Sequence, residues 1–279
     1  MRSARGTRGA FLSQEERAFA LTLALKVKRQ RSTHDVRLST FDEEMSHPQA
    51  DLQQAFANGD LEIKGQFTLG SNYTFLVEVT YEDRKYPAVY KPTRGEQPLW
   101  DFEESTLALR EVAAYLVSEA LGFHIVPFTA LREEGPYGAG SLQQFVEHDP
   151  DYHYFNFTPE DKLLLKPVTL FDLLVNNADR KGGHVFFEND TRRLYAIDHG
   201  ICFHEQDKLR TVLWDFGGQK IPDDLLPRLS LTSNLLADLE PYLSPREIEA
   251  LQARADAILQ RGVFPRQPRD RRAIPWPPL

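Results

Sequence analysis

The sequence predicts an α+β protein in which an antiparallel sheet lobe comes first and a mainly helical lobe follows. Two patterns indicate this order: β-branched and aromatic residues alternate with polar ones over 61–91, and helical spacing dominates from Thr158 onward. The chain has 279 residues, enough for two lobes that share a cleft. Its 41% hydrophobic and 27% charged residues are typical of a protein that buries a core.

The predicted sheet lobe begins with a short helix over 51–57. The segment 61–79 then predicts a hairpin, interrupted by a turn at 69–73. A third strand over 88–91 ends at Pro92, which has no amide proton to donate. These strands form the first half of the expected sheet.

A helix over 107–121, with Gly122 as its C-cap, is expected to pack on this sheet. Two further strands, at 125–132 and 141–147, flank a glycine-rich turn at 135–140. The first lobe is therefore predicted to contain five strands.

The second lobe is predicted to begin with one long helix over 160–176. A short hairpin over 185–197 and a late helix over 244–261 follow. The expected organisation is a basic, disordered extension at 1–45, a nucleotide-binding sheet lobe at 46–148, a catalytic helical lobe at 149–265 and a tail rich in Pro and Arg at 266–279.

Charge is distributed unevenly along the chain. Residues 1–32 carry eight Lys and Arg against two Glu, a net charge of +6. Because the whole chain has a net charge of −8, the residues after position 32 carry −14. We expect the basic segment to be a solvated extension, with Met45 as the natural start, although a nucleic-acid arm or a membrane-surface helix remains an alternative. The acidic remainder is expected to repel nucleic acid and anionic lipid.

The chain has a single cysteine, Cys202, which can form neither an internal disulfide nor a structural zinc site with a second thiol. A reducing compartment, the cytoplasm, is therefore expected. No stretch approaches the roughly 20 apolar residues that span a bilayer, so no membrane insertion is expected.

Five polar features occur in an order that suits phosphoryl transfer: a Gly-Ser-Asn turn at 70–72, Lys91 on a strand, Glu111 on a helix, and then Asp179 and Asp198. Backbone amides of a tight turn and a lysine ammonium offset the charge of a triphosphate, while carboxylates hold the bridging metal. Together the features predict a site for ATP and a divalent metal.

Lys91 lies in an apolar run and needs a counter-charge if it is buried, for which Glu111 is the expected partner. The alternative is an edge-strand lysine that points to water. Asp179 lies in a polar loop and can accept or orient a hydroxyl proton, whereas Asp198 ends a short apolar strand and suits Mg²⁺. The alternatives are a surface salt bridge between Asp179 and Arg180 and a simple turn at 198–200.

These residues belong to six stretches in which the sequence resembles the phosphatidylinositol 3- and 4-kinase-like superfamily, and within it an uncharacterised bacterial group. The stretches are 70–76, 89–92, 98–102, 110–115, 177–184 and 197–200, and the resemblance spans about residues 51–279. It implies a two-lobed, protein-kinase-like fold that binds ATP with Mg²⁺ or Mn²⁺.

The resemblance also implies a role for each site residue. Lys91 would contact the α- and β-phosphates and pair with Glu111, Asp179 would be the catalytic-loop aspartate, and Asp198 would bind metal. The linker strand 143–146, with Gln144, Phe145 and Val146, would receive the adenine by backbone hydrogen bonds. The turn of Gly70, Ser71 and Asn72 would contact the phosphates.

One position departs from the superfamily pattern: His184 stands where the second metal-binding residue is normally asparagine. Imidazole suits Mn²⁺ better than Mg²⁺, so His184 is expected to bind metal with a changed preference, to weaken metal binding or to contact phosphate. The expected activity is an ATP-dependent phosphotransferase acting on a protein hydroxyl or a soluble small molecule. A catalytically silent nucleotide-binding module and an AMP transferase are the alternatives.

Overall fold

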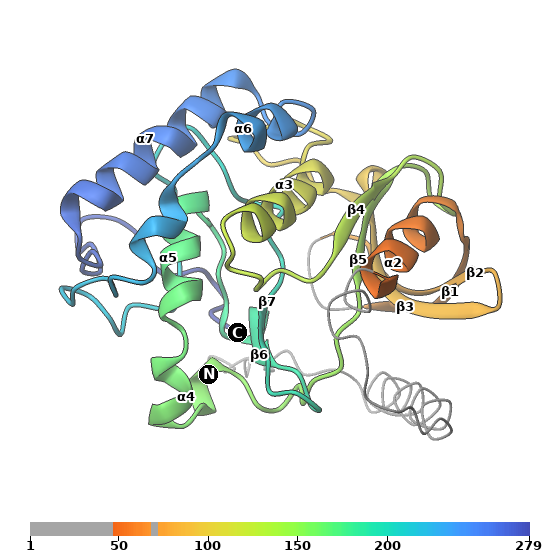
Figure 1. Ribbon diagram of the computed structural model, residues 1–279, viewed down its shortest axis with the longest axis horizontal. Coiled ribbons are helices and arrows are strands. Elements are labelled where there is room, and N and C mark those ends of the chain that lie inside the picture. Colours follow the sequence, from red (N-terminus) through yellow and green to blue (C-terminus); the bar gives the residue numbers. More distant parts are fainter. Residues whose placement is uncertain (1–46, 68–71) are drawn as a thin grey trace, which may run out of the picture.

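The computed structural model describes residues 47–67 and 72–279. Within these ranges, five strands form one antiparallel sheet in the order β1-β2-β3-β5-β4 (Figure 1). Their bounds are Asp60–Phe67 for β1, Thr74–Tyr81 for β2, Arg84–Pro92 for β3, Thr129–Arg132 for β4 and Gly140–Gln144 for β5. The basic extension expected at 1–45, and Gly70 and Ser71 of the expected turn, lie outside the described residues.

Helix α2, His47–Asn58, covers the sheet and supplies part of its core (Figure 1). Phe56 from this helix is fully buried with Val77 and Ala88 from the neighbouring strands β2 and β3. Side chains that alternate along the strands thus place one face of the sheet against the helix.

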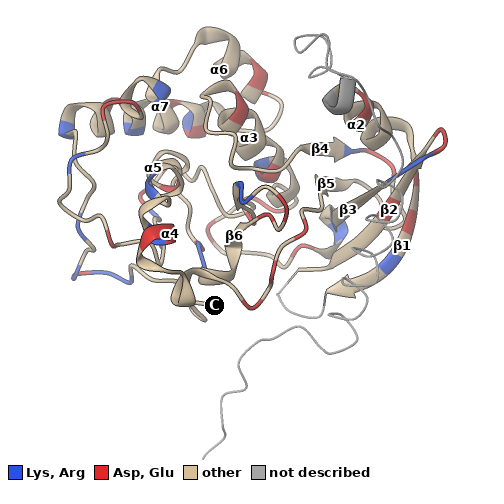
Figure 2. Ribbon diagram, turned by 60° about the horizontal axis from the view of Figure 1, so that its bottom comes forward, with Lys and Arg blue, Asp and Glu red and all other residues tan. Residues whose placement is uncertain are grey.

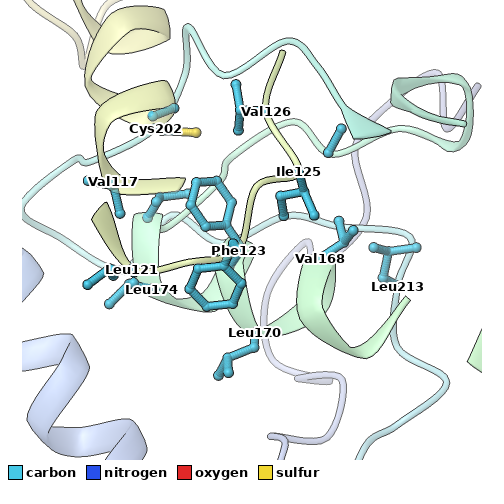
Figure 3. Close-up of a cluster of buried hydrophobic side chains, with 14 of the residues drawn as sticks. Val117, Leu121, Phe123, Ile125, Val126, Val168, Leu170, Leu174, Cys202 and Leu213 are labelled. Atoms are coloured by element: carbon cyan, nitrogen blue, oxygen red, sulfur yellow. The ribbon is translucent and has the colours of Figure 1, made fainter. Parts of the chain in front are cut away.

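Helix α3, Leu107–Ala120, contacts both lobes, because it packs on β4 and β5 and also on α6. Its residues Ala113 and Val117 belong to a large core that continues through Leu174 of the helical lobe. Figure 3 shows side chains of this core from α3, from the following segment 123–126 and from the helical lobe. The helix that carries Glu111 is therefore fixed from two sides.

The helical lobe contains several short elements and one longer helix. They are α4 Pro159–Leu163, α5 Lys166–Val175, the hairpin of β6 Val185–Phe187 and β7 Leu194–Ala196, α6 Ser233–Leu239 and α7 Pro245–Arg261. Turns of 3₁₀ helix lie at η1 Thr93–Gly95, η2 Tyr154–Asn156, η3 Gly182–His184 and η4 Leu226–Leu229. A sheet lobe followed by a mainly helical lobe confirms the α+β prediction.

The long helix predicted over 160–176 was wrong, since the segment forms two helices, α4 and α5, separated at Leu164 and Leu165. Pro167 lies in the first turn of α5. A proline cannot donate to the carbonyl four residues earlier, and its ring collides with the preceding turn, so a helix begins rather than continues there.

The strands predicted at 125–132 and 141–147 are shorter than expected. The Ser118 hydroxyl of α3 accepts hydrogen bonds from the backbone N–H groups of Ile125 and Val126, so β4 begins only at Thr129. The late helix is confirmed, because the Ser244 hydroxyl and the Glu247 carboxylate form a capping box at the start of α7.

Candidate functional site

A cavity of about 490 Å³ lies between the sheet lobe and the helical lobe. Strands β2 and β3 line one side, and the loop 181–184 and the residues after β7 line the other. Lys91, Glu111, His184 and Asp198 all line this cavity. Residues that are far apart in the sequence therefore meet in one cleft. Ligand-binding and catalytic sites commonly combine such a cavity with a few converging polar groups.

Lys91 lies at the centre of the charged groups. Its ammonium Nζ is 2.5 Å from Glu111 Oε1 and 3.0 Å from Asp198 Oδ1. The Glu111 side chain is only 3% exposed, and that of Lys91 is 23% exposed. The alternative of an edge-strand lysine that points to water is therefore wrong.

The two carboxylates keep Lys91 charged. Burial alone would lower the pKa of the Lys91 ammonium, but Asp198 and Glu111 outweigh it and raise that pKa above its ordinary value. Burial likewise opposes ionisation of Asp198, yet Lys91 and His184 hold the pKa of the Asp198 carboxyl below its ordinary value. The site thus contains an ammonium between two carboxylates, and a phosphate can take the place of one carboxylate as its partner.

Backbone geometry fixes Asp198 and its neighbour. Asp198 has a φ of 64°, in the left-handed region that non-glycine residues seldom occupy. The next residue, His199, donates its backbone N–H to Glu111 Oε2 at 3.0 Å. Glu111 therefore holds Lys91 through one oxygen and the loop that carries Asp198 through the other, which argues against a simple turn at 198–200.

His184 lies beside Asp198, with Nε2 3.2 Å from Oδ2. Burial lowers the pKa of the His184 imidazole to about 4, so the ring is neutral at pH 7. Its Nδ1 accepts the backbone N–H of Lys181 at 3.5 Å, which assigns the proton to Nε2. In this tautomer the nitrogen of His184 that lies 3.2 Å from the Asp198 carboxylate carries the proton.

The donor set fits a divalent metal that also binds phosphates. Within residues 47–67 and 72–279, no group of three or more His, Cys, Asp or Glu side chains could enclose an ion. Mg²⁺ commonly takes only one or two protein carboxylates and completes its shell with phosphate oxygens and water, so Asp198 fits this requirement. His184 fits as a ligand only in the other tautomer, with a free lone pair on Nε2.

Asp179 lies beside the cavity rather than in its wall. Its Oδ2 is 3.3 Å from the Lys181 ammonium, and its backbone N–H donates to the Asn177 side chain at 2.9 Å. Burial raises the pKa of the Asp179 carboxyl, and the charge of Asp198 raises it further, against the opposing effect of Lys181. A carboxylate whose conjugate acid has a raised pKa accepts a proton more readily at neutral pH than an exposed aspartate does.

Asn72 lines the cavity, but its side chain has a structural partner: Oδ1 accepts the Gln97 backbone N–H at 2.7 Å. Nearby, Glu96 accepts the N–H groups of Leu107 and Ala108 at 3.2 and 2.9 Å. Glu96 therefore caps α3, a role that the sequence analysis missed because the helix begins eleven residues later.

The expected adenine segment follows β5. The Gln144 N–H donates to the Phe128 carbonyl and the Phe145 N–H to the Pro87 carbonyl. In the described part of the chain, the Val146 N–H donates to no other group. Of the three residues, Val146 is thus the one with a backbone donor left for a base.

Arg180 is fully buried, so the alternative of a surface salt bridge with Asp179 is wrong. Its guanidinium bonds both carboxylate oxygens of Asp172 at 2.9 to 3.1 Å. It also donates to the carbonyls of His184 and Ile197 at 3.3 and 2.6 Å and to His199 Nε2 at 2.7 Å. Arg180 therefore joins the loop of Asp179 and His184 to the loop of Asp198.

The sequence analysis missed this network. The available signal was Asp172, the one acidic residue of the largely apolar helix α5, which requires a partner if it is buried.

Comparisons with known proteins identify the family of this chain. Residues 98–255 match the family described as phosphatidylinositol 3- and 4-kinase. Protein Rv2133c of Mycobacterium tuberculosis is 38% identical over 267 residues, covering 81% of this chain and 95% of that protein. Phosphatidylinositol 4-kinase gamma 4 of Arabidopsis thaliana is 34% identical over 134 residues, which cover 38% of this chain and 23% of the plant protein.

Solved structures were also compared with this chain, and one of them supports the fold. Hydra Fam20, solved with sugar, aligns with a TM-score of 0.55 and 15% identity over 82% of this chain and 92% of that one. The Helicobacter pylori proinflammatory kinase CtkA aligns with a TM-score of 0.46 and 14% identity over 75% of this chain and 94% of that one. The fold is kinase-like, and together with the family match it supports a phosphotransferase. The chain belongs to the phosphatidylinositol 3- and 4-kinase family.

Proposed function

We propose that this protein is an ATP-dependent phosphotransferase whose acceptor is a protein hydroxyl or a soluble small molecule. The observation that carries the proposal is the Lys91 ammonium, held 2.5 Å from Glu111 and 3.0 Å from Asp198 in the wall of an interlobe cavity. Phosphoryl transfer depends on positioning and charge neutralisation more than on covalent chemistry, and this arrangement supplies both.

In the proposed complex, the adenine lies at Val146 and accepts its backbone N–H. Val146 and Lys91 line the same cavity, so the triphosphate extends from the base toward the ammonium. The phosphates then replace Asp198 as a partner of Lys91, while Glu111 retains it. Asp198 is thereby released to hold Mg²⁺ or Mn²⁺, which when bound offsets the phosphate charge.

Asp179 is proposed to orient the acceptor hydroxyl and to take its proton. The raised pKa of its carboxyl favours this proton transfer, and Lys181 at 3.3 Å holds the side chain in place. Gly70 and Ser71 are proposed to cover the phosphates, as the resemblance implies.

A soluble or protein acceptor follows from the charge of the chain. The residues after position 32 carry a net −14, which disfavours approach to an anionic membrane surface. Acidic and basic residues alternate along α7 and do not gather into a basic face there (Figure 2). Among the described helices, none has the length and apolar character needed to cross a membrane.

A catalytically silent nucleotide-binding module is the second candidate. It is favoured by His184, which stands where the superfamily places a second metal ligand and whose Nε2, protonated in the tautomer described above, lies 3.2 Å from Asp198 Oδ2. Such a protein would bind ATP through Lys91 without transferring phosphate.

Titration of the protein with ATP, under Mg²⁺ and Mn²⁺ separately, tests these functions when it is followed by tracking of labelled phosphate. We expect nucleotide binding with either metal and transfer of the γ-label to the protein itself or to a component of a lysate. Binding without hydrolysis or transfer would establish the silent module instead. Transfer of an α-label without the γ-label would establish AMP transfer, and absence of binding would contradict every version.

A further inference from the structure

The loop between Asp179 and the β6 strand contains two adjacent glycines, Gly182 and Gly183, with Lys181 before them and His184 after them. A Cβ added to Gly182 would lie 2.6 Å from the Phe155 ring and 3.5 Å from Leu279 Cδ1. A Cβ on Gly183 would lie 3.8 Å from the same Leu279 atom. The loop is therefore enclosed by two side chains that come from elsewhere in the chain.

Leu279 reaches this loop at the end of the segment 271–279, here called the strap. The Arg271 guanidinium binds both Asp207 oxygens at 2.9 Å, and the Ala273 carbonyl accepts from Thr211 N and Trp214 Nε1 at 3.0 and 3.2 Å. These contacts fix the strap along the segment that follows Asp198.

The strap also contacts the loop between Asp179 and β6, here called the catalytic loop. The Pro278 carbonyl accepts the Gly182 backbone N–H at 2.8 Å, and Leu279 lines the cavity together with Lys91 and Asp198. Both views of the chain place its last residues beside β6 and α4 (Figures 1 and 2).

We propose that Phe155 and the strap form a clamp that positions the catalytic loop for phosphoryl transfer. Glycine is conformationally permissive, so a Gly-Gly turn does not by itself hold a fixed geometry. Lys181 and His184, on either side of the turn, contact the carboxylates of Asp179 and Asp198. A shift of the turn therefore moves both carboxylates.

The clamp rests on the proposed function but not on the family relationship. The strap lies outside residues 98–255, the part of the chain that matches the family, whereas Phe155 lies inside it. Phe155 and Leu279 are positioning residues.

Leu279→Ala and Phe155→Ala test the clamp, and Leu259→Ala is the matched control because Leu259 is 41% exposed on α7, away from the site. Each clamp variant is expected to lower kcat about 10-fold, since displacements of an ångström or less cost up to about 100-fold in rate. The Kd for ATP should change less than about 2-fold, because Lys91 and Val146 lie outside the loop. The control should have the same kcat and Kd as the unmodified protein. An increase in kcat for Leu279→Ala would overturn the proposal, because it would show that the strap inhibits the reaction.

Hydrogen exchange of the Gly182 amide provides a readout that needs no turnover. The Pro278 carbonyl protects this amide, so exchange should accelerate in Leu279→Ala and remain unchanged in Leu259→Ala. Equal exchange in both variants would overturn the clamp. If the unmodified protein binds no nucleotide, the proposed function fails, and the exchange measurement still decides whether the strap holds the loop.

Discussion

The two walls of the cleft hold their functional groups in different ways. On the sheet side, Lys91 extends from a regular strand, and its two ion-pair partners within residues 47–67 and 72–279, Glu111 and Asp198, belong to other elements. On the helical side, Arg180 is fully buried. Its guanidinium joins two loops through Asp172, two carbonyls and His199. A strand positions a side chain by its own backbone ladder, whereas irregular loops require a buried polar network to do so.

This difference predicts where substitutions affect chemistry and where they affect the fold. Groups on the cavity surface can be changed at modest cost in stability, because they are partly exposed. Groups of the network cannot, because removal of one partner leaves an uncompensated charge in the interior.

Asp198→Asn should have the largest effect on activity. It removes the charge that is proposed to hold metal, without creating a cavity, so turnover should fall on the order of 10³-fold. Calorimetric titration with Mg·ATP and Mn·ATP should show loss of metal-dependent binding, while the melting curve stays cooperative. Asp190→Asn, at an exposed position, serves as the control. Unchanged affinity for both complexes would remove Asp198 from the metal site.

Arg180→Met should have the largest effect on stability. It leaves the Asp172 carboxylate buried and unpaired, which costs about 3–5 kcal/mol of unfolding free energy. Urea unfolding measures this loss. The double variant with Asp172→Leu should recover much of it, since no buried charge then remains. A single variant as stable as the unmodified protein would show that the network does not support the helical wall.

Lys91→Met should have a smaller effect, confined to the nucleotide. Loss of one charge-assisted contact to phosphate costs about 1.5–3 kcal/mol, so the Kd for ATP should rise about 10- to 100-fold. The fold should survive, because Glu111 keeps its hydrogen bond from the His199 N–H. Full turnover in this variant would show that Lys91 does not contribute to nucleotide binding.

The smallest expected effect is a shift of the pH profile. Since burial and Asp198 raise the pKa of the Asp179 carboxyl, kcat should fall as the pH drops through that raised value, where the base becomes protonated. Lys181 opposes this rise, so Lys181→Met should move the acid limb of the kcat profile to higher pH. A profile that does not move, or moves to lower pH, would contradict the role of Asp179 as the base.

Regular elements with strong local signals were predictable. The alternating segment 61–91 forms β1, β2 and β3, and the Ser244 and Glu247 pattern begins α7. Predictions failed where a side-chain contact outside the periodic pattern decided the boundary, as when the Ser118 hydroxyl accepts the Ile125 N–H and β4 begins only at Thr129. The short helix α6 was not predicted at all.

In the site, residue types and their order predicted that Lys91, Glu111 and Asp198 meet, and the structure brings them together. The roles assigned to Asp179 and to the segment 144–146 stay predictions. The buried pairing of Arg180 could not be read from its position after Asp179, because adjacent residues in a loop face different directions.

The sequence by itself determined the α+β class, most of the strands and the set of charged residues available for phosphate chemistry, because these depend on periodicity and residue type. Only the tertiary structure decided that Arg180 is interior, that Glu96 caps α3 and that the strap returns to Gly182. Each of these contacts joins segments whose separation along the chain carries no local signal, so packing of the whole core selects them.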